Sequence, residues 1–340
     1  MTASRPSPGA SVAVSAQPPR NGPMVDVRDL SVRFTTGRGD ARAVNGIGFQ
    51  VQAGEVLGLI GESGCGKSVT LRALMRLLPE GRATIGGSIT VGGEDVLAMP
   101  PQRLGAYRGG TVAMIFQDPA LALDPVYTVG QQISETVRRH LGCSRAEARD
   151  RALQMLEQVK VPSARARLDN YPFEMSGGMR QRVMIALALS CNPPLVLADE
   201  PTTALDATVQ IQVLLIFREL QQRLGMSAIF VTHDLGVAAE ICDRIAVMYA
   251  GRIVERGSAQ DILLQPRHPY TQALLASTIH GSLRGTRIQG IGGAPPDITR
   301  LPAGCAFRER CPRALAVCAT VVPELVGGPG GHALACHADA

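Results

Sequence analysis

The run GESGCGKS at residues 61–68 constrains the fold more than any other feature, because it fits the pattern G-x-x-x-x-G-K-[S/T] at every fixed position. A β-rich run, EVLGLI, comes before it. SVTLRALMRLL follows, with apolar residues at helical spacing, and is expected to stop at Pro79. In a strand–loop–helix unit of this kind, backbone N–H groups and the positive end of the helix surround a phosphate. The sequence therefore predicts a nucleotide-binding loop.

The polar residues of this loop have separate expected tasks. We expect Lys67 to reach the β- and γ-phosphates and the Ser68 hydroxyl to ligate Mg²⁺. Of the 34 basic residues, only Lys67 and Lys160 are lysines, which indicates a site that needs a compact ammonium group rather than a planar fork. Cys65 lies between two glycines of the loop, where surrounding donors are expected to favour its thiolate.

Three further short apolar runs end in polar side chains. LVLADE ends in Asp199, expected to hold Mg²⁺ through its waters, and Glu200, expected to polarise the attacking water at the γ-phosphate. His233 ends FVTHD and is expected to hydrogen-bond the γ-phosphate. Gln117, in IFQDP, is expected to join the Mg²⁺ shell and to lead into a helical segment.

A second anion-binding turn is predicted in the run MSGGM at residues 175–179. Ser176, Gly177 and Gly178 stand just before a run of helix-forming residues, and a hydroxyl with free amides at a helix N-terminus suits an anion. The chain thus carries a second such turn more than a hundred residues after a complete phosphate-binding loop.

Strands that alternate with helices predict an α/β core with a largely parallel sheet. IAVMYAGRIVERG is expected to form a hairpin around Ala250 and Gly251. We divide the chain into a Ser/Pro/Ala-rich leader at residues 1–23, expected to be disordered, a main domain at 24–265 and a small extension at 266–340. A helical insertion is expected at about 118–190, and beyond Gln265 the pattern dissolves into Pro/Gly-rich segments and a cysteine cluster.

Composition excludes several classes of protein. No uninterrupted apolar stretch is long enough to span a bilayer, and the N-terminal run lacks the apolar core of a signal peptide. The net charge of +5 is mild and spread along the chain, so it gives little support to nucleic-acid binding. A membrane role is therefore expected to be peripheral, through partner proteins.

In order, these motifs resemble those of the ATP-binding-cassette (ABC) ATPases over about residues 24–265. The matching elements are the Walker A loop at 61–68, the Q-loop Gln117, the signature at 175–179, the Walker B strand at 195–200, ALD at 204–206 and the switch His233. The resemblance implies a P-loop NTPase (RecA-like) core with an antiparallel β subdomain and an inserted α-helical subdomain. It also implies ATP hydrolysis in a head-to-tail dimer, where each signature binds the γ-phosphate of ATP held by the other subunit's Walker A loop.

The resemblance carries roles onto single positions of this chain. Nucleotide-binding roles fall on Gly61, Gly64, Cys65, Gly66, Lys67, Ser68, Val69, Gln117, Ser176, Gly177, Gly178 and Asp206, catalytic roles on Lys67, Glu200 and His233, and Mg²⁺ contacts on Ser68, Gln117 and Asp199. The usual signature is LSGGQ, whereas this chain has Met175 and Met179 at its ends. Phe34 is the candidate for stacking on adenine, and the alternative is that it is a core residue of a strand.

The C-terminal part resembles that of the oligopeptide/dipeptide-type importer ATPases. The runs RHPYTQALL, IFQDP, ADEPTTALD and VMYAGRIVE carry this resemblance. It implies a complex of two transmembrane permeases, two ATPases that are copies or paralogues, and an extracytoplasmic solute-binding protein. The chain would then lie at the cytoplasmic face of the inner membrane and power uptake of peptides. Importers of nickel or glutathione share these motifs.

Four cysteines, Cys305, Cys311, Cys318 and Cys336, follow with the spacing C-x5-C-x6-C-x17-C. Four thiolates suit a [4Fe–4S] cluster or an all-thiolate Zn²⁺ site. The gaps are wider than in the usual C-x2-C zinc knuckle, which favours the cluster over zinc, and a reduced, metal-free fold is the third alternative.

Two other classes of ABC protein fit the sequence less well. Soluble members that act on DNA or ribosomes usually carry a long heptad insertion, a zinc-finger insertion or a second cassette, whereas only 108 residues, without sustained heptads, separate Lys67 from Ser176. A regulatory module that binds ATP without hydrolysing it would lack a catalytic carboxylate, and Glu200 is present.

Overall fold

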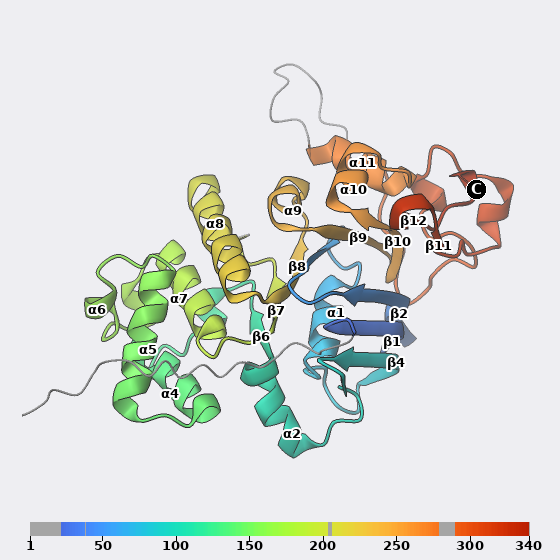
Figure 1. Cartoon of the computed structure of the whole chain (residues 1–340). Helices are drawn as coiled ribbons and strands as arrows, with labels where there is room; N and C mark the ends of the chain where they lie inside the picture. Colours follow the sequence, from blue (N-terminus) through green and yellow to red (C-terminus); the bar gives the residue numbers. More distant parts are fainter. Residues whose placement is uncertain (1–21, 38, 203–205, 279–289, 340) are drawn as a thin grey trace, which may run out of the picture.

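The computed structural model describes residues 22–37, 39–202, 206–278 and 290–339. Most of the predicted leader, Ala204 and Leu205 therefore lie outside the described residues. Within them, the main sheet has the strand order β11-β12-β10-β9-β3-β8-β7-β6 (Figure 1). Its parallel part consists of β3 (Val56–Ile60), β6 (Val112–Ile115), β7 (Leu195–Asp199), β8 (Ser227–Thr232) and β9 (Arg244–Tyr249). The predicted α/β core with a largely parallel sheet is confirmed.

Both faces of these parallel strands are buried, and alternate residues of each strand enter different cores. Val56 and Ile60 pack with the helical side of the molecule, whereas Leu57 and Leu59 pack with the antiparallel sheet and the helix that follows the glycine-rich loop. A parallel sheet needs such cover on both faces, and the side-chain period of two divides its residues between them.

The end of the main sheet away from the helical side is antiparallel. β10 (Arg252–Ser258) pairs with β9 through the expected hairpin, in which Ala250 and Gly251 both have positive φ. β12 (Ala333–Leu334) pairs with β10, and β11 (Val326–Gly327) pairs with β12. The C-terminal extension therefore continues the main sheet.

A second, antiparallel sheet has the order β2-β1-β4-β5 among the described residues. Its strands are β1 (Val25–Thr36), β2 (Gly39–Val51), β4 (Ala83–Val91) and β5 (Glu94–Asp95). Alternation along β1 places Val25 and Val27 in the core, and a register shift after Val27 returns Val32 to the same face. The antiparallel β subdomain implied by the resemblance is confirmed.

Helix α1 (Lys67–Leu74) follows the glycine-rich loop but ends earlier than expected, before Pro79. The side chains of Tyr107 and Arg108 explain the end of the helix. The Tyr107 hydroxyl donates to the Leu74 carbonyl at 2.8 Å, and Arg108 Nε donates to the Met75 carbonyl at 2.9 Å. These bonds satisfy carbonyls that the helix itself leaves without partners.

The helical segment after β6 forms a separate group beside it in Figure 1. The helices from β4 to this group are α2 (Pro101–Ala106), η1 (Tyr107–Thr111), α3 (Pro119–Ala122), α4 (Val129–Leu141), α5 (Arg145–Gln158), α6 (Ala164–Arg167), η2 (Pro172–Glu174) and α7 (Gly177–Leu189). Ser144 caps α5 in a capping box with Glu147, and Thr128 caps α4 in the same way with Gln131.

The remaining helices are α8 (Ala207–Leu224), α9 (Leu235–Ile241), α10 (Ala259–Leu264) and α11 (Pro269–Thr278). Helix α11 was not predicted, because the sequence beyond Gln265 was expected to lack regular structure. Residues 290–339 add the short 3-10 turns η4 (Arg308–Arg310), η5 (Ala316–Ala319), η6 (Pro329–Gly331) and η7 (His337–Asp339). None of the helices in the described part of the chain is long and apolar enough to cross a membrane.

Candidate functional site

The predicted polar residues meet at one edge of the main sheet, because parallel strands place their carboxyl ends together. The glycine-rich loop follows β3, Asp199 ends β7, and His233 stands just after β8. Gln117 lies two residues after the end of β6 and is exposed. Open α/β sheets bind ligands at this edge.

The glycine-rich loop packs closely against neighbouring backbone. Gly61 has φ 155° and Gly66 has φ 110°. A Cβ on Gly61 would lie well inside contact distance of the Met248 carbonyl oxygen, and one on Gly66 would do the same to the Ala43 carbonyl oxygen. Both positions therefore need glycine, and the loop is held between β9 and β2.

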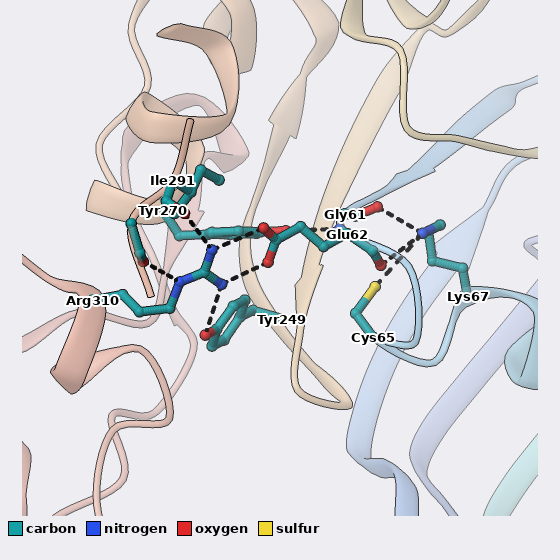
Figure 2. Close-up of polar contacts among 9 residues, drawn as sticks. Gly61, Glu62, Cys65, Lys67, Tyr249, Tyr270, Ile291 and Arg310 are labelled. Carbon is teal, nitrogen blue, oxygen red and sulfur yellow. Dashed lines mark hydrogen bonds and ion pairs between the residues drawn. The ribbon is translucent and has the colours of Figure 1, made fainter. Parts of the chain in front are cut away.

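The Lys67 ammonium group is partnered by the loop itself (Figure 2). Its Nζ donates to the carbonyl oxygens of Gly61 at 2.6 Å and Glu62 at 3.0 Å, and lies 3.8 Å from Cys65 Sγ. The Lys67 residue is only 5% exposed. An anion in the loop would find a compact cation already held there, and would have to displace its two carbonyl partners.

Cys65 differs from its prediction. The residue is buried, and burial raises the pKa of its thiol more than the nearby Lys67 charge and the backbone N–H groups of Lys67 and Cys65 lower it. The expectation that its surroundings favour the thiolate is therefore wrong. A thiol enclosed in this way behaves as a small apolar side chain.

Ser68 and Asp199 join the first turn of α1 to the end of β7. The Ser68 hydroxyl donates to Asp199 Oδ1 at 2.8 Å. Burial raises the pKa of Asp199, the Ser68 bond lowers it in part, and the charge of Glu200 raises it further. A hydroxyl beside a partly desolvated carboxylate is an oxygen pair that suits a hard divalent cation, whose charge would offset the cost of burial.

Glu200 and His233 form the next contact along this edge. His233 Nδ1 lies 3.1 Å from Glu200 Oε2, and the Glu200 N–H donates to the Val231 carbonyl at 3.0 Å. Glu200 has φ 45°, a left-handed conformation that is uncommon for a residue with a side chain. Such conformations persist where the surrounding structure holds them, often at functional sites.

The remaining predicted positions have ordinary local roles in this structure. Phe34 is half-buried on β1, where it packs against the core, and Val69 packs there from α1. Asp206 caps α8 by accepting the Val209 N–H at 3.0 Å. Gly64 has φ 80° at the tip of the loop.

The signature turn lies apart from the glycine-rich loop. Ser176 caps α7 by accepting the Met179 N–H at 3.4 Å, and α7 packs against β6. The signature turn follows η2 rather than a strand, whereas the glycine-rich loop follows β3, which lies three strands from β6 in the sheet. Met175 is 5% exposed and belongs to the core, which accounts for an apolar residue at the first signature position.

The C-terminal cysteines are close together but are not arranged as a metal site in the described part of the chain. Among the described residues, no group of three or more Cys, His, Asp or Glu side chains is arranged to hold a metal ion. The four cysteines do lie near one another. The Cys305 N–H donates to the Cys318 carbonyl at 2.9 Å, and after burial, which is the main cause, the other three thiols also raise the pKa of Cys305.

Two residues near the site carry no sequence signal. Arg310, in the C-terminal extension, forms a two-pronged ion pair with Glu62 of the glycine-rich loop. Gln181, on α7, donates to the Pro201 carbonyl directly after Glu200 and so ties the signature helix to the end of β7. A partner in a distant segment leaves no local pattern by which either residue could be found.

Comparisons with known proteins agree with this geometry. The family model described as ABC transporter matches residues 44–203, and the one described as oligopeptide/dipeptide transporter, C-terminal region, matches residues 254–318. The chain is 49% identical to the probable peptide ABC transporter ATP-binding protein y4tR of Sinorhizobium fredii, with 92% of this chain and 94% of that protein covered. It is 48% identical to the oligopeptide transport ATP-binding protein OppD of Salmonella typhimurium, with 94% of each covered.

A third curated relative is the dipeptide transport ATP-binding protein DppD of Bacillus subtilis, 45% identical, with 92% of this chain and 94% of that protein covered. Among solved structures, the dimeric ATP-binding cassette MJ0796 bound to ADP and Pi is similar with a TM-score of 0.63 and 27% identity. That likeness covers 69% of this chain and 99% of the other.

The signature helix packs so tightly on α8 that one of its two glycines should not tolerate a side chain. A Cβ on Gly178 would lie 2.7 Å from Val209 Cγ1, whereas one on Gly177 meets no described atom within 4 Å beyond its own helix backbone and chain neighbours. We expect Gly178→Ala to lower the free energy of unfolding by about 1–3 kcal/mol through overpacking, offset by up to about 1 kcal/mol of helix propensity. Denaturant unfolding of both alanine variants measures this, and equal midpoints would contradict it.

Proposed function

The chain belongs to the ABC transporter family of ATP-binding, ATP-hydrolysing subunits, and we propose that it powers an importer of dipeptides or oligopeptides. One observation carries the ATPase part, which is the meeting of the glycine-rich loop, Asp199, Glu200 and His233 at one edge of the sheet. The peptide substrate is supported by relatives whose names state peptide transport and whose likeness spans more than nine-tenths of both chains.

For ATP binding, we propose that Lys67 exchanges its two carbonyl partners for phosphate oxygens, while the loop amides surround the β-phosphate. Ser68 and Asp199 are the residues that would hold Mg²⁺, and Gln117 would join them from the end of β6. The ion would neutralise charge on the β- and γ-phosphates. Phe34 stays the candidate for contact with adenine.

For hydrolysis, we propose Glu200 as the group that polarises the attacking water. Its side chain is 14% exposed, and its position is held by the backbone bond to Val231 and by His233. His233, with 54% of its side chain exposed, can turn from Glu200 towards the γ-phosphate and keep the water in place.

The signature turn supports a second cassette as partner. Ser176, Gly177 and Gly178 open the N-terminus of α7, which packs against β6 rather than beside the glycine-rich loop after β3, and we propose that they bind the ATP of another subunit. We propose a head-to-tail dimer with a copy or a paralogue, in which each Lys67 site faces the partner's signature.

Exposed apolar side chains beside the signature support docking to a permease. They are Phe116, Leu121, Val126, Tyr127, Tyr171 and Phe173. The Val129 N–H donates to the Asn170 carbonyl at 2.9 Å, which brings the two contributing segments together. Apolar surface of this kind marks protein contacts. We propose that the complex contains two transmembrane permeases, and that they dock on this surface at the cytoplasmic face of the inner membrane. An extracytoplasmic solute-binding protein completes the complex, and no nucleic acid is involved.

We propose residues 24–265 as the ATPase domain, with its helical insertion at about 118–190, and residues 266–340 as an extension joined to it by the pairing of β12 with β10.

For the four cysteines of this extension we propose a [4Fe–4S] cluster in preference to Zn²⁺. Their proximity supports this, but their present arrangement is not a ligand set, so binding requires the segments to draw together.

Removal of the Lys67 ammonium group should abolish tight nucleotide binding. We expect Lys67→Ala to weaken ATP affinity by roughly 100-fold, because charge-assisted bonds to phosphate are lost. Lys160→Ala is the matched control, since the other lysine of the chain is exposed and pairs with Glu219. Equilibrium binding of ATP with Mg²⁺ measures both, and unchanged affinity in Lys67→Ala would overturn the assignment of the loop.

Removal of the Glu200 charge should stop hydrolysis after ATP has bound. We expect Glu200→Gln to lower turnover by at least about 100-fold and to accumulate an ATP-bound dimer. Glu219→Gln, at an exposed ion pair, should turn over ATP like the wild type. From gently solubilised membranes, the trapped protein should carry two polytopic permeases and a second cassette. Recovery only with ribosomes or DNA would contradict the importer, and wild-type turnover would contradict the role of Glu200.

The cysteine proposal predicts metal in protein purified without oxygen. We expect about four iron and four sulfide per chain in the wild type and a loss of both in Cys311→Ser. Cys143→Ser is the control, because this cysteine lies in the helical segment, outside the C-terminal group. Zinc in place of iron, or no metal at all, would refute the cluster.

A further inference from the structure

Arg310, an arginine of the C-terminal extension, forms an ion pair with the phosphate-binding loop (Figure 2). Arg310 Nη1 donates to Glu62 Oε2 at 2.7 Å, and Nη2 donates to Glu62 Oε1 at 2.9 Å. Glu62 is the second residue of the loop. A guanidinium and a carboxylate joined by two parallel bonds form one of the strongest and most directional ion pairs in proteins.

Further hydrogen bonds and burial hold the Arg310 side chain in place. Besides Glu62, its guanidinium donates to the Tyr249 hydroxyl at 3.2 Å and to the carbonyls of Ile291 at 3.2 Å and Gly292 at 2.9 Å. These bonds occupy all the N–H donors that an arginine has. The side chain is only 4% exposed, so the fork is pre-formed before any nucleotide arrives.

Aromatic rings of the core and the extension enclose this arginine. The guanidinium carbon lies 5.8 Å from the centre of the Tyr249 ring and 5.9 Å from that of Phe307. The Tyr249 and Phe307 rings are in turn packed on Tyr270 of α11, with centroid distances of 4.6 and 5.4 Å from Tyr270. The same cluster therefore joins α11, β9 and the turn that carries Arg310.

The extension holds the backbone of Glu62 as well as its side chain. The Glu62 N–H donates to the Tyr270 hydroxyl at 2.8 Å, and the Glu62 carbonyl accepts from Lys67 Nζ at 3.0 Å. Residues 295–298 and 62–65 also line one pocket of about 300 Å³. A continuous path of contacts thus leads from Arg310 through Glu62 to the lysine of the phosphate site.

From this path we propose that Arg310 is a positioning residue for nucleotide binding, which makes the C-terminal extension part of the ATP site. The inference rests on the assignment of residues 61–68 as the phosphate site under the proposed function. Arg310 has two effects on the loop. It fixes the Glu62 carbonyl that presents Lys67, and it neutralises a carboxylate that would otherwise repel a triphosphate close by.

The test is a double-mutant cycle on ATP affinity in the full chain with Mg²⁺. We expect Arg310→Ala to weaken ATP binding about tenfold, which corresponds to 1.4 kcal/mol. Arg310→Lys should fall between this variant and the wild type, because an ammonium group cannot form the fork. Arg308→Ala is the matched control: Arg308 lies in the same 3-10 turn, 39% of its side chain is exposed, and it pairs with the exposed Glu309.

The sign of the Glu62→Gln effect separates positioning from a general loss of stability. With Arg310 present, Glu62→Gln should weaken ATP binding, because the fork is lost. In the Arg310→Ala background it should strengthen binding, because it removes a free carboxylate near the triphosphate. A fold defect would not reverse sign in this way.

Two outcomes would overturn the inference, namely additive effects of the two substitutions or an affinity of Arg310→Ala equal to that of Arg308→Ala. Lys67→Ala, measured beside them, distinguishes a failure of the phosphate-site assignment from a failure of the positioning role. If Lys67→Ala binds ATP normally, the phosphate site itself is wrongly assigned. If it loses binding while Arg310→Ala does not, only the positioning role fails.

Discussion

Cover on both faces of the parallel strands is the constraint on which the rest of the structure depends. Leu57 and Leu59 enter one core, and Val56 and Ile60 enter the other. A strand that slipped by one residue would exchange its two sets of side chains, so the register is strongly fixed. The carboxyl ends of the strands are thereby fixed as well. Residues that are far apart in the sequence, such as Ser68 and Asp199, arrive at the same edge within hydrogen-bond distance.

At that edge, the key charged groups of the site have a partner within the protein. Lys67 is held by loop carbonyls, Asp199 by the Ser68 hydroxyl, and Glu200 contacts His233. A nucleotide bound as proposed would exchange partners with groups that are already oriented, which costs less reorganisation than assembling them. Asp199 is the least favourably placed of these groups, because burial raises the pKa of its carboxyl group. A nearby cation would offset this effect of burial.

Local patterns in the sequence were sufficient for much of this arrangement. Apolar runs marked the strands, and the glycine-rich loop marked the turn after β3 and the start of α1. Helix α11 was missed because the sequence beyond Gln265 was interpreted as Pro/Gly-rich and irregular, although a proline such as Pro269 suits the first turn of a helix. The state of Cys65 was misjudged because its position between glycines does not show that neighbouring segments bury it. Pairs such as Arg310 and Glu62 depend on tertiary packing and have no counterpart in sequence spacing.

The ion pair between Glu62 and Arg310 joins residues 248 positions apart, which has a consequence for the newly made chain. At about 5–20 residues per second, Arg310 leaves the ribosome on the order of 10–50 s after Glu62. Domains generally fold as units during synthesis, so the core around the loop can form in that interval while Glu62 still lacks its cation. If Arg310 has the proposed positioning role, a nascent cassette gains its full hold on ATP only after this later segment has been translated.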